Sequence, residues 1–379
     1  MSLDRFISKL LLFCIPLYFT QGWLFGSGST VSQILIGIWL MADFYYLVCF
    51  YQKPFGGSVS NAVLVFWIVN LIYWVVSPKE VRSFGLTYPT FGDFKNLTTV
   101  MLSFFPVAVL TKRGVIDDGF MRRFFVLFLG AAIVAYLTKQ EANLVAFGDI
   151  VTNNTAYYFA VLLPFLGFFF GKKGFWIGYI IILVFLLLCA KRGALLLAVV
   201  SLLVYLIVSF KSSSSKNRLS RIFSISLLLA LISIVAVTLY SSSDLLQSRM
   251  LDTQEGNLSE RDTIYRDLWS VFFQSSFIEK IFGHGMSQTV PLIGGYAHND
   301  WLELLTNEGV FGVSLYAAVF LSFFTCYRRY HLRTMKPQYR FLFLSALLCF
   351  LARSAFSMGY LAPESALFCI AMAYGQTKK

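Results

Sequence analysis

Charged residues are scarce in this chain, and their scarcity excludes a water-soluble fold. Only 13% of the 379 residues are charged, whereas 58% are hydrophobic and 40 are Phe. Soluble domains carry roughly 25% charged residues. A water-soluble fold of this length could not bury so much apolar surface. We therefore expect a polytopic, all-α membrane protein in which residues 1–379 form a single transmembrane domain.

Motifs for disulfides, metals and nucleotides are also lacking. The six Cys residues lie in or at the ends of apolar runs and none lies in the long polar stretch 241–299, so neither a disulfide framework nor a Cys-rich metal site is indicated. The sequence contains no P-loop, no His-Glu-x-x-His, no Gly-x-Ser-x-Gly and no carboxylate cluster typical of a metal site. We expect no metal and no cofactor.

The apolar runs predict about twelve membrane spans, because crossing a bilayer takes roughly 17 to 25 apolar residues. Between the ninth and tenth spans, residues 241–299 form a large polar loop that could shape a site. The expected spans are 6–25, 30–50, 60–77, 97–111, 121–138, 154–171, 174–190, 193–210, 222–240, 308–327, 339–353 and 360–375.

The distribution of charge predicts the orientation of these spans. With both termini in the cytoplasm, the inner loops hold 20 of the 31 Lys and Arg residues, but only 4 of the 19 Asp and Glu residues. The positive-inside rule therefore favours a multi-pass inner-membrane protein with the large loop on the periplasmic side. The net charge of +12 is explained by this topology, so no nucleic-acid partner is expected.

Two cations lie in an outer turn, against this general pattern. Lys191 and Arg192 stand between two strongly apolar runs, in the turn formed by residues 190–193. Cations on the outer face oppose the insertion preference, which suggests a function for them. The alternative is that both side chains reach outward to lipid head groups.

The large loop contains an amphipathic stretch that predicts a helix over residues 261–273, suited to the membrane surface. Arg261 begins this helix and is a candidate ligand for an anion. Arg266 is a second candidate, although an ion pair with Asp262 four residues earlier is its alternative. His284 follows in a Gly-His-Gly turn, where it is either a turn residue or a part of the site.

His298 is one of only three histidines and precedes a predicted helix. Asp300 and Glu303 have capping-box spacing, so a helix is expected to begin at Asp300, with Asn299 and Trp301 beside the site. The helix N-terminus would favour a neutral imidazole, the form required of a general base. The alternative is that residues 298–300 form only a polar cap.

The candidate residues together suit a phosphate-bearing lipid. Arginine pairs with phosphate oxygens in a bidentate manner. Tyr296 and Trp301 have rings that can stack on sugars or lie at the membrane interface, and the sequence does not separate these two roles.

These residues resemble the signature region of the O-antigen ligase and polymerase superfamily, whose members are polytopic bacterial enzymes with a large periplasmic loop. The motif resemblance covers residues 261–316, and the number of spans also fits. The matching residues are Arg261, Tyr265, the Phe-Gly-His-Gly run at 282–285, the His-Asn-Asp-Trp-Leu run at 298–302, Gly309 and Gly312.

The resemblance implies a metal-independent, inverting glycosyl transfer at the periplasmic face, with a glycan on undecaprenyl diphosphate as the donor. By position, His298 is similar to the essential histidine of the family, which acts on the acceptor hydroxyl. Arg261 and Arg192 are similar to the arginines that hold the diphosphate, with Arg266 and Lys191 as further candidates.

The acceptor distinguishes two expected activities. A polymerase would use a lipid-linked repeat unit, and a ligase would use lipid A-core. The runs at 283–285 and 299–303 resemble the polymerases more, so a surface-polysaccharide polymerase is the first expectation, with membrane lipids and a chain-length regulator as further partners. A lipid-linked oligosaccharide transporter is the alternative from another class, but the charges gather in outer loops and not at mid-membrane.

Overall fold

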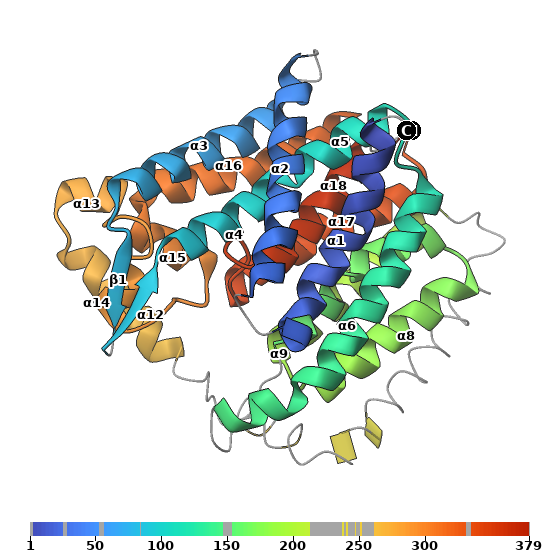
Figure 1. Ribbon diagram of the computed structural model, residues 1–379. Helices are drawn as coiled ribbons and strands as arrows, with labels where there is room; N and C mark the ends of the chain where they lie inside the picture. The colour runs from blue at the N-terminus through green and yellow to red at the C-terminus, as the bar shows by residue number, and fades with distance from the viewer. Residues whose placement is uncertain are drawn as a thin grey trace.

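The computed structural model is built almost entirely of helices (Figure 1). It describes residues 3–25, 29–52, 57–83, 85–146, 154–212, 261–330 and 335–378, together with a few isolated positions between 237 and 251. The first half contains α1 (Leu3–Phe25), α2 (Thr30–Gln52), α3 (Ser58–Val76), α4 (Phe91–Leu102), α5 (Phe104–Lys112) and α6 (Asp118–Ala146). The later elements are α7 (Ala156–Ala160), η1 (Leu163–Phe169), α8 (Lys173–Leu188), α9 (Arg192–Lys211), α12 (Arg261–Gln274), α13 (Phe277–Phe282), α14 (Thr289–Ile293), α15 (Asp300–Asn307), α16 (Gly309–Tyr330), α17 (Pro337–Phe356), η3 (Pro363–Ser365) and α18 (Ala366–Thr377).

Seven helical segments among the described residues are long and apolar enough to cross a membrane. Two shorter apolar segments, formed by α7 with η1 and by α8, lie between them. The predicted span 222–240 lies outside the described residues except for isolated positions. The prediction of a polytopic membrane protein is therefore supported. The count of twelve spans and the large loop over residues 241–299 stay predictions.

The core forms where apolar helices pack around α17. This helix contacts α9, α18 and η1, while α16 packs against α3, and α1 packs against α2 and α6. Many large side chains at these contacts, such as Phe165, Phe341 and Tyr374, are almost completely buried. By contrast, α3 and α16 leave Ile72, Val76 and other apolar residues exposed, as expected for surfaces that face lipid.

The expected span 97–111 is divided into α4 and α5 at Ser103. The Ser103 hydroxyl donates to the Thr99 carbonyl at 2.7 Å and accepts from the Trp39 indole at 2.9 Å. The carboxyl group of buried Asp43 lies 3.3 Å from the same hydroxyl oxygen, so the hydroxyl hydrogen is shared between the Thr99 carbonyl and this group. Hydrogen bonds of serine to its own helix backbone compete with regular helical bonding, so the break coincides with a buried polar contact between α2 and α4.

A β-hairpin departs from the all-α prediction. Strands β1 (Glu80–Ser83) and β2 (Leu86–Pro89) pair in an antiparallel manner. The Ser83 hydroxyl donates to the carbonyl of Gly294 at 3.1 Å, and Ser77 accepts from the backbone N–H of Met286 at 2.7 Å. The hairpin is therefore held by a segment about 200 residues later in the chain.

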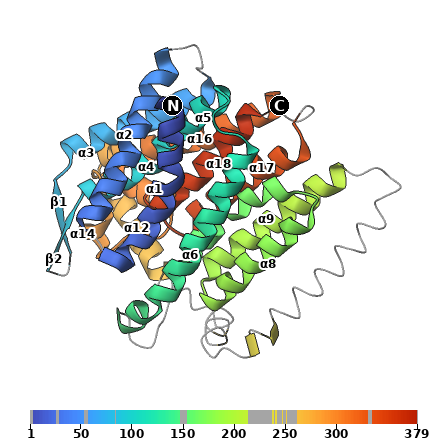
Figure 2. The same cartoon turned by 45° about the vertical axis from the view of Figure 1, so that its right-hand side comes forward.

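The two ends of the helical bundle differ. Figure 2 shows both chain termini at the upper side of the molecule. In Figure 1, the helices α12 to α15 and the hairpin gather at the opposite, left-hand end. The candidate residues in α12 and before α15 consequently lie far from the termini.

Candidate functional site

His298 directly precedes α15, as the sequence predicts. The helix begins at Asp300, but its N-cap is Asn299, whose side-chain oxygen accepts from the backbone N–H groups of Trp301 at 2.9 Å and Leu302 at 3.2 Å. Asn299 also donates to the carbonyl of Ala355 at 2.9 Å. This side chain therefore ties the segment carrying His298 to the C-terminal end of α17.

The capping-box interpretation of Asp300 and Glu303 was wrong. Glu303 is buried, and its carboxylate accepts from the Ala297 backbone N–H at 2.7 Å, the Asn307 side chain at 3.0 Å and the Thr289 hydroxyl. Burial raises the pKa of Glu303 to about 7, and these hydrogen bonds oppose the rise. Glu303 thus fixes the backbone immediately before His298 instead of capping the helix.

Asp300 is a structural anchor. Its buried carboxylate accepts from the backbone N–H groups of Gly359 at 2.7 Å and Tyr360 at 3.0 Å, and from the Tyr316 hydroxyl at 2.9 Å. Burial raises its pKa to about 6, against the effect of these donors. Asp300 therefore joins α15 and α16 to the loop that follows α17.

The backbone at His298 adopts an unusual conformation, with φ of 52°. Few non-glycine residues enter this left-handed region, and they do so where the surroundings impose it. The flanking residues provide such restraint, because the Ala297 N–H is bound by Glu303 and Asn299 caps α15. The residue as a whole is more exposed than its buried neighbours Ala297 and Asp300.

The imidazole of His298 is held neutral by its surroundings. Partial removal of water around the ring, followed by the positive charges of Arg261 and Lys191, lowers the pKa of His298 to about 4. An imidazole with this pKa is uncharged at neutral pH and can accept a proton. The neutral form expected from the sequence is thus supported, by desolvation and neighbouring cations.

Arg261 begins α12 and reaches the same region. Its guanidinium donates to the carbonyl of Phe356, the last residue of α17, at 2.7 Å. The C-terminal end of a helix carries partial negative charge, which favours a cation there. Since Asn299 binds the neighbouring carbonyl of Ala355, the end of α17 holds both Arg261 and the segment of His298.

Lys191 and Arg192 stand where α8 turns into α9. Lys191 is the N-cap of α9 and Arg192 its first residue, and both are half-buried. Ala190 before them has φ of 48°. A side chain at Gly193 would approach the Tyr157 hydroxyl to 2.7 Å, so glycine permits this close packing. The turn therefore presents two cations and the positive end of a 20-residue helix.

Arg353 of α17 is a residue that the sequence interpretation missed. It is buried, forms an ion pair with Glu364, and donates to the carbonyl of Met358 at 3.0 Å. Its guanidinium lies 4.2 Å from the centre of the Tyr157 ring. Tyr157 in turn packs against Gly193, so a buried charge supports the turn that carries Lys191 and Arg192.

The Gly-His-Gly run is a docking element. His284 N–H donates to the carbonyl of Thr306 at 3.0 Å and Gly285 N–H to that of Asn307 at 2.8 Å. Gly283 and Gly309 have φ of 73° and 66°, and a side chain at either position would overlap the backbone of the opposing segment. Residues 283–285 therefore pack tightly against the junction between α15 and α16 and fix its backbone.

The same junction places Gly309 and Gly312 in a different helix from Asp300. The helix is interrupted at Glu308, between α15 and α16, and the Glu308 carboxyl group is buried there. The run of matching residues from Asp300 to Gly312 is therefore divided between α15 and α16.

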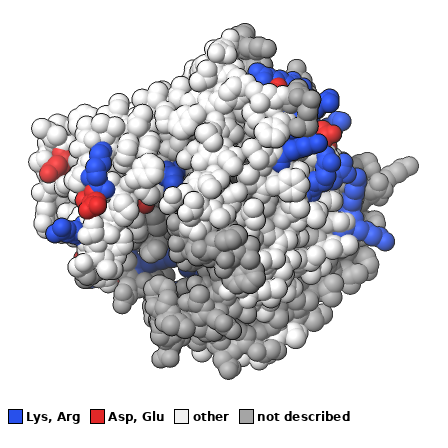
Figure 3. Space-filling model, in the orientation of Figure 1, with Lys and Arg blue, Asp and Glu red and all other residues white. Residues whose placement is uncertain are grey.

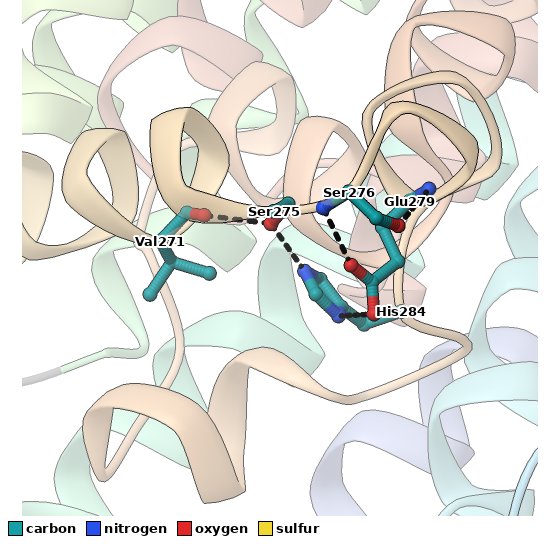
Figure 4. Close-up of polar contacts among 5 residues, drawn as sticks. All are labelled: Val271, Ser275, Ser276, Glu279 and His284. Carbon is teal, nitrogen blue, oxygen red and sulfur yellow. Dashed lines mark hydrogen bonds and ion pairs between the residues drawn. The ribbon is translucent and has the colours of Figure 1, made fainter.

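The His284 side chain is held by local partners (Figure 4). One ring nitrogen lies 2.9 Å from the Ser275 hydroxyl and the other 3.6 Å from the Glu279 carboxylate. Glu279 itself accepts from the backbone N–H of Ser276 at 2.8 Å, at the start of α13. His284 thus stabilises the turn between α12 and α13, in agreement with the turn interpretation.

Three remaining candidates lie apart from these contacts. Arg266 is exposed on α12 and forms neither the expected ion pair with Asp262 nor another polar contact within the described part of the chain. Trp301 packs on the rings of Tyr316 and Phe320 at 5.2 and 6.1 Å between centroids. The Tyr296 hydroxyl donates to Asp93 at 3.2 Å, and burial raises its pKa.

The amphipathic helix predicted over 261–273 is confirmed as α12, with Leu268 buried. Its outer side and the following α13 expose large apolar residues: Trp269 is 43%, Phe273 68% and Phe277 77% exposed. Such residues suit the interfacial depth of a membrane. Among the described residues no cluster of three or more potential metal ligands is found.

A family comparison covers the segment that contains most of these residues. Residues 177–317 match the family model described as O-antigen ligase. The matched segment begins in α8, includes the turn of Lys191 and Arg192, Arg261 and His298, and ends in α16. No curated protein matches the chain.

Proposed function

Because the chain belongs to the O-antigen ligase/polymerase superfamily, we propose that it is a membrane glycosyltransferase. It transfers a glycan from undecaprenyl diphosphate to a sugar hydroxyl, without a metal and with inversion of the anomeric centre. The observation that carries this proposal is the meeting of Arg261 and the segment of His298 at the C-terminal end of α17, where the cations Arg261 and Lys191 also lower the pKa of the imidazole.

The reaction needs a base for the acceptor. The acceptor hydroxyl oxygen attacks the anomeric carbon of the donor and forms the new glycosidic bond, while the bond from that carbon to the diphosphate oxygen breaks. The hydroxyl proton passes to a ring nitrogen of His298, and the leaving diphosphate keeps the bonding electrons. A neutral imidazole suits this role, and positioned proton transfer contributes typically 10²- to 10⁴-fold to a rate.

The leaving group needs positive charge. Arg261, Lys191 and Arg192 are the groups that we assign to the diphosphate, with the N-terminal amides of α9 beside the last two. Charges that are already in position stabilise the negative charge that develops on the leaving oxygens. The Phe356 carbonyl accepts from Arg261 and fixes its guanidinium. The packing of Arg353 on Tyr157 supports the turn that carries Lys191 and Arg192.

The proposed orientation follows the positive-inside rule. Both termini lie on the cytoplasmic side of the inner membrane, and α12 to α15 lie on the periplasmic side. The apolar residues exposed on α12 and α13 support an interfacial location for this end, where a lipid-linked donor presents its diphosphate.

A polymerase is our first assignment and a ligase the second, which the description of the matching family favours. Purified protein in nanodiscs is incubated with undecaprenyl-diphosphate glycan in the presence of EDTA. Longer lipid-linked chains from donor alone identify a polymerase, and product that requires lipid A-core identifies a ligase. Absence of transfer to either acceptor contradicts the proposed enzyme.

A further inference from the structure

A groove lies between α1 and α6, at the end of the molecule opposite to His298. Its volume is about 840 Å³, within the range of small-molecule sites. Four cations line it: Arg5 and Lys9 from α1, and Arg122 and Arg123 from α6. Figure 3 shows Lys and Arg side chains gathered at the upper right, over the end of the molecule where Figure 1 shows these two helices beginning.

These four cations are exposed, and no described carboxylate lies within ion-pair distance of them. The neighbouring acidic residues are already bound elsewhere. Asp4 pairs with Arg113 at 2.9 Å, Asp118 accepts from Tyr339 at 2.9 Å, and Asp117 accepts from the backbone N–H of Phe120 at 2.7 Å. The four lining cations outnumber the two nearby carboxylates that lack a cationic partner among the described residues, so positive charge remains in excess at the mouth of the groove and favours an anion from outside the chain.

The groove continues along an apolar wall. Phe13 and Val126, two of its lining residues, are 59% and 61% exposed, and Leu127 and Phe169 extend the wall. A free inorganic anion would gain nothing from such a wall, because apolar surface is stabilised only when another apolar group covers it. A molecule with an anionic head and a hydrocarbon tail matches both parts.

We propose that this groove binds an anionic phospholipid, with its phosphate among the four cations and the first part of an acyl chain along Phe13 and Val126. Basic pockets between membrane helices are known to take anionic head groups, and each Lys or Arg near such a surface strengthens the attraction. The site joins α1 to α6 and is independent of the proposed glycosyl transfer.

A charge pair elsewhere provides the matched control. Arg122 and Arg123 are consecutive exposed arginines in the groove, and Arg328 and Arg329 are consecutive exposed arginines at the end of α16, outside it. We compare Arg122→Gln/Arg123→Gln with Arg328→Gln/Arg329→Gln. A third variant, Val126→Trp, fills the groove while all cations stay in place. It therefore tests the shape of the groove without changing the charge of the protein or its insertion into the membrane.

The measurement is native mass spectrometry of the full chain in detergent, titrated with phosphatidylglycerol or phosphatidylcholine. We expect one tightly bound phosphatidylglycerol, at least tenfold preferred over phosphatidylcholine, and no displacement by millimolar inorganic phosphate. The groove pair and Val126→Trp should each weaken binding about tenfold or more, while the α16 pair stays within about twofold.

Four outcomes would overturn the proposal. Equal binding of the two lipids would show that the four cations do not select an anionic head group. Unchanged binding in Val126→Trp would mean that the cations act as an open patch and not as a groove. Displacement by inorganic phosphate would show that no acyl chain is held between α1 and α6. An equal loss in the α16 pair would show that binding follows the net charge of the protein and not this groove.

Discussion

The junction between α15 and α16 offers a steric test of how the site is held. Gly309 has φ of 66°, and a side chain there would lie 2.7 Å from the backbone nitrogen of Gly283 and still closer to the carbonyl of Ile281. Gly309→Ala therefore adds both backbone strain and overlap. It should separate the Gly-His-Gly run from the junction on which α15 and the segment of His298 depend.

The magnitude follows from the two costs. A left-handed conformation costs a residue with a Cβ about 1–2 kcal/mol. Overpacking against a close-packed neighbour costs typically about 1–3 kcal/mol. Their sum is roughly 2–5 kcal/mol for Gly309→Ala, which corresponds to a fall in Tm of roughly 4–10 °C at about 2 °C per kcal/mol for a large domain.

Alanine variants of two other glycines allow the backbone strain and the steric overlap to be measured separately. Gly171 has φ of 73° with open space around its Cβ position, and Gly295 has open space without a positive φ. Thermal unfolding of the three alanine variants in detergent should give the largest loss for Gly309→Ala, an intermediate loss for Gly171→Ala and little change for Gly295→Ala. If Gly309→Ala unfolds at the same temperature as Gly171→Ala, the tight docking inferred for this junction is incorrect.

Three further predictions concern buried or crowded charges. Burial raises the pKa of Glu308 from its ordinary value of 4.5 to about 8, so its cost to stability grows as the pH rises from about 4.5 to 8. The stability of Glu308→Gln should be close to that of the wild type near pH 4 and exceed it by a growing margin up to pH 9, and a pH-independent difference would contradict this. His298, with a pKa of about 4, should be protonated in only about one molecule in a thousand at pH 7, and an NMR titration midpoint near 6.5 would refute the desolvated setting. Arg353→Gln should cost about 3–5 kcal/mol by leaving Glu364 buried without its partner, and Arg353→Gln/Glu364→Gln should recover part of it in thermal unfolding; no loss in the single variant would exclude a structural ion pair.

The fold could be predicted from hydropathy only at the level of its spans. Apolar runs and helix lengths follow directly from sequence, so α2, α3, α9 and α16 lie close to their predicted ranges. The breaks at Ser103 and Glu308 depend on side chains that meet other helices. The β-hairpin has strands of four residues, too short for a clear alternation, and its anchor Gly294 lies far along the chain.

The site was predicted where a local pattern existed and missed where it did not. Asn299 and Asp300 lie at a recognisable helix start, which located His298 correctly. Arg353 gave no signal, because a single cation at the end of an apolar run has the pattern of an ordinary helix terminus. The sequence does not show that Glu364 is its partner, because the two residues meet only when the loop after α17 folds back.

In the proposed reaction, His298 takes the acceptor proton while separate cations hold the donor. The most direct test measures donor binding and turnover together in His298→Ala, with undecaprenyl-diphosphate glycan in nanodiscs. We predict that donor affinity stays within about twofold while turnover falls by about 10²-fold or more. Turnover within tenfold of the wild type in a folded His298→Ala protein would show that His298 is not the base.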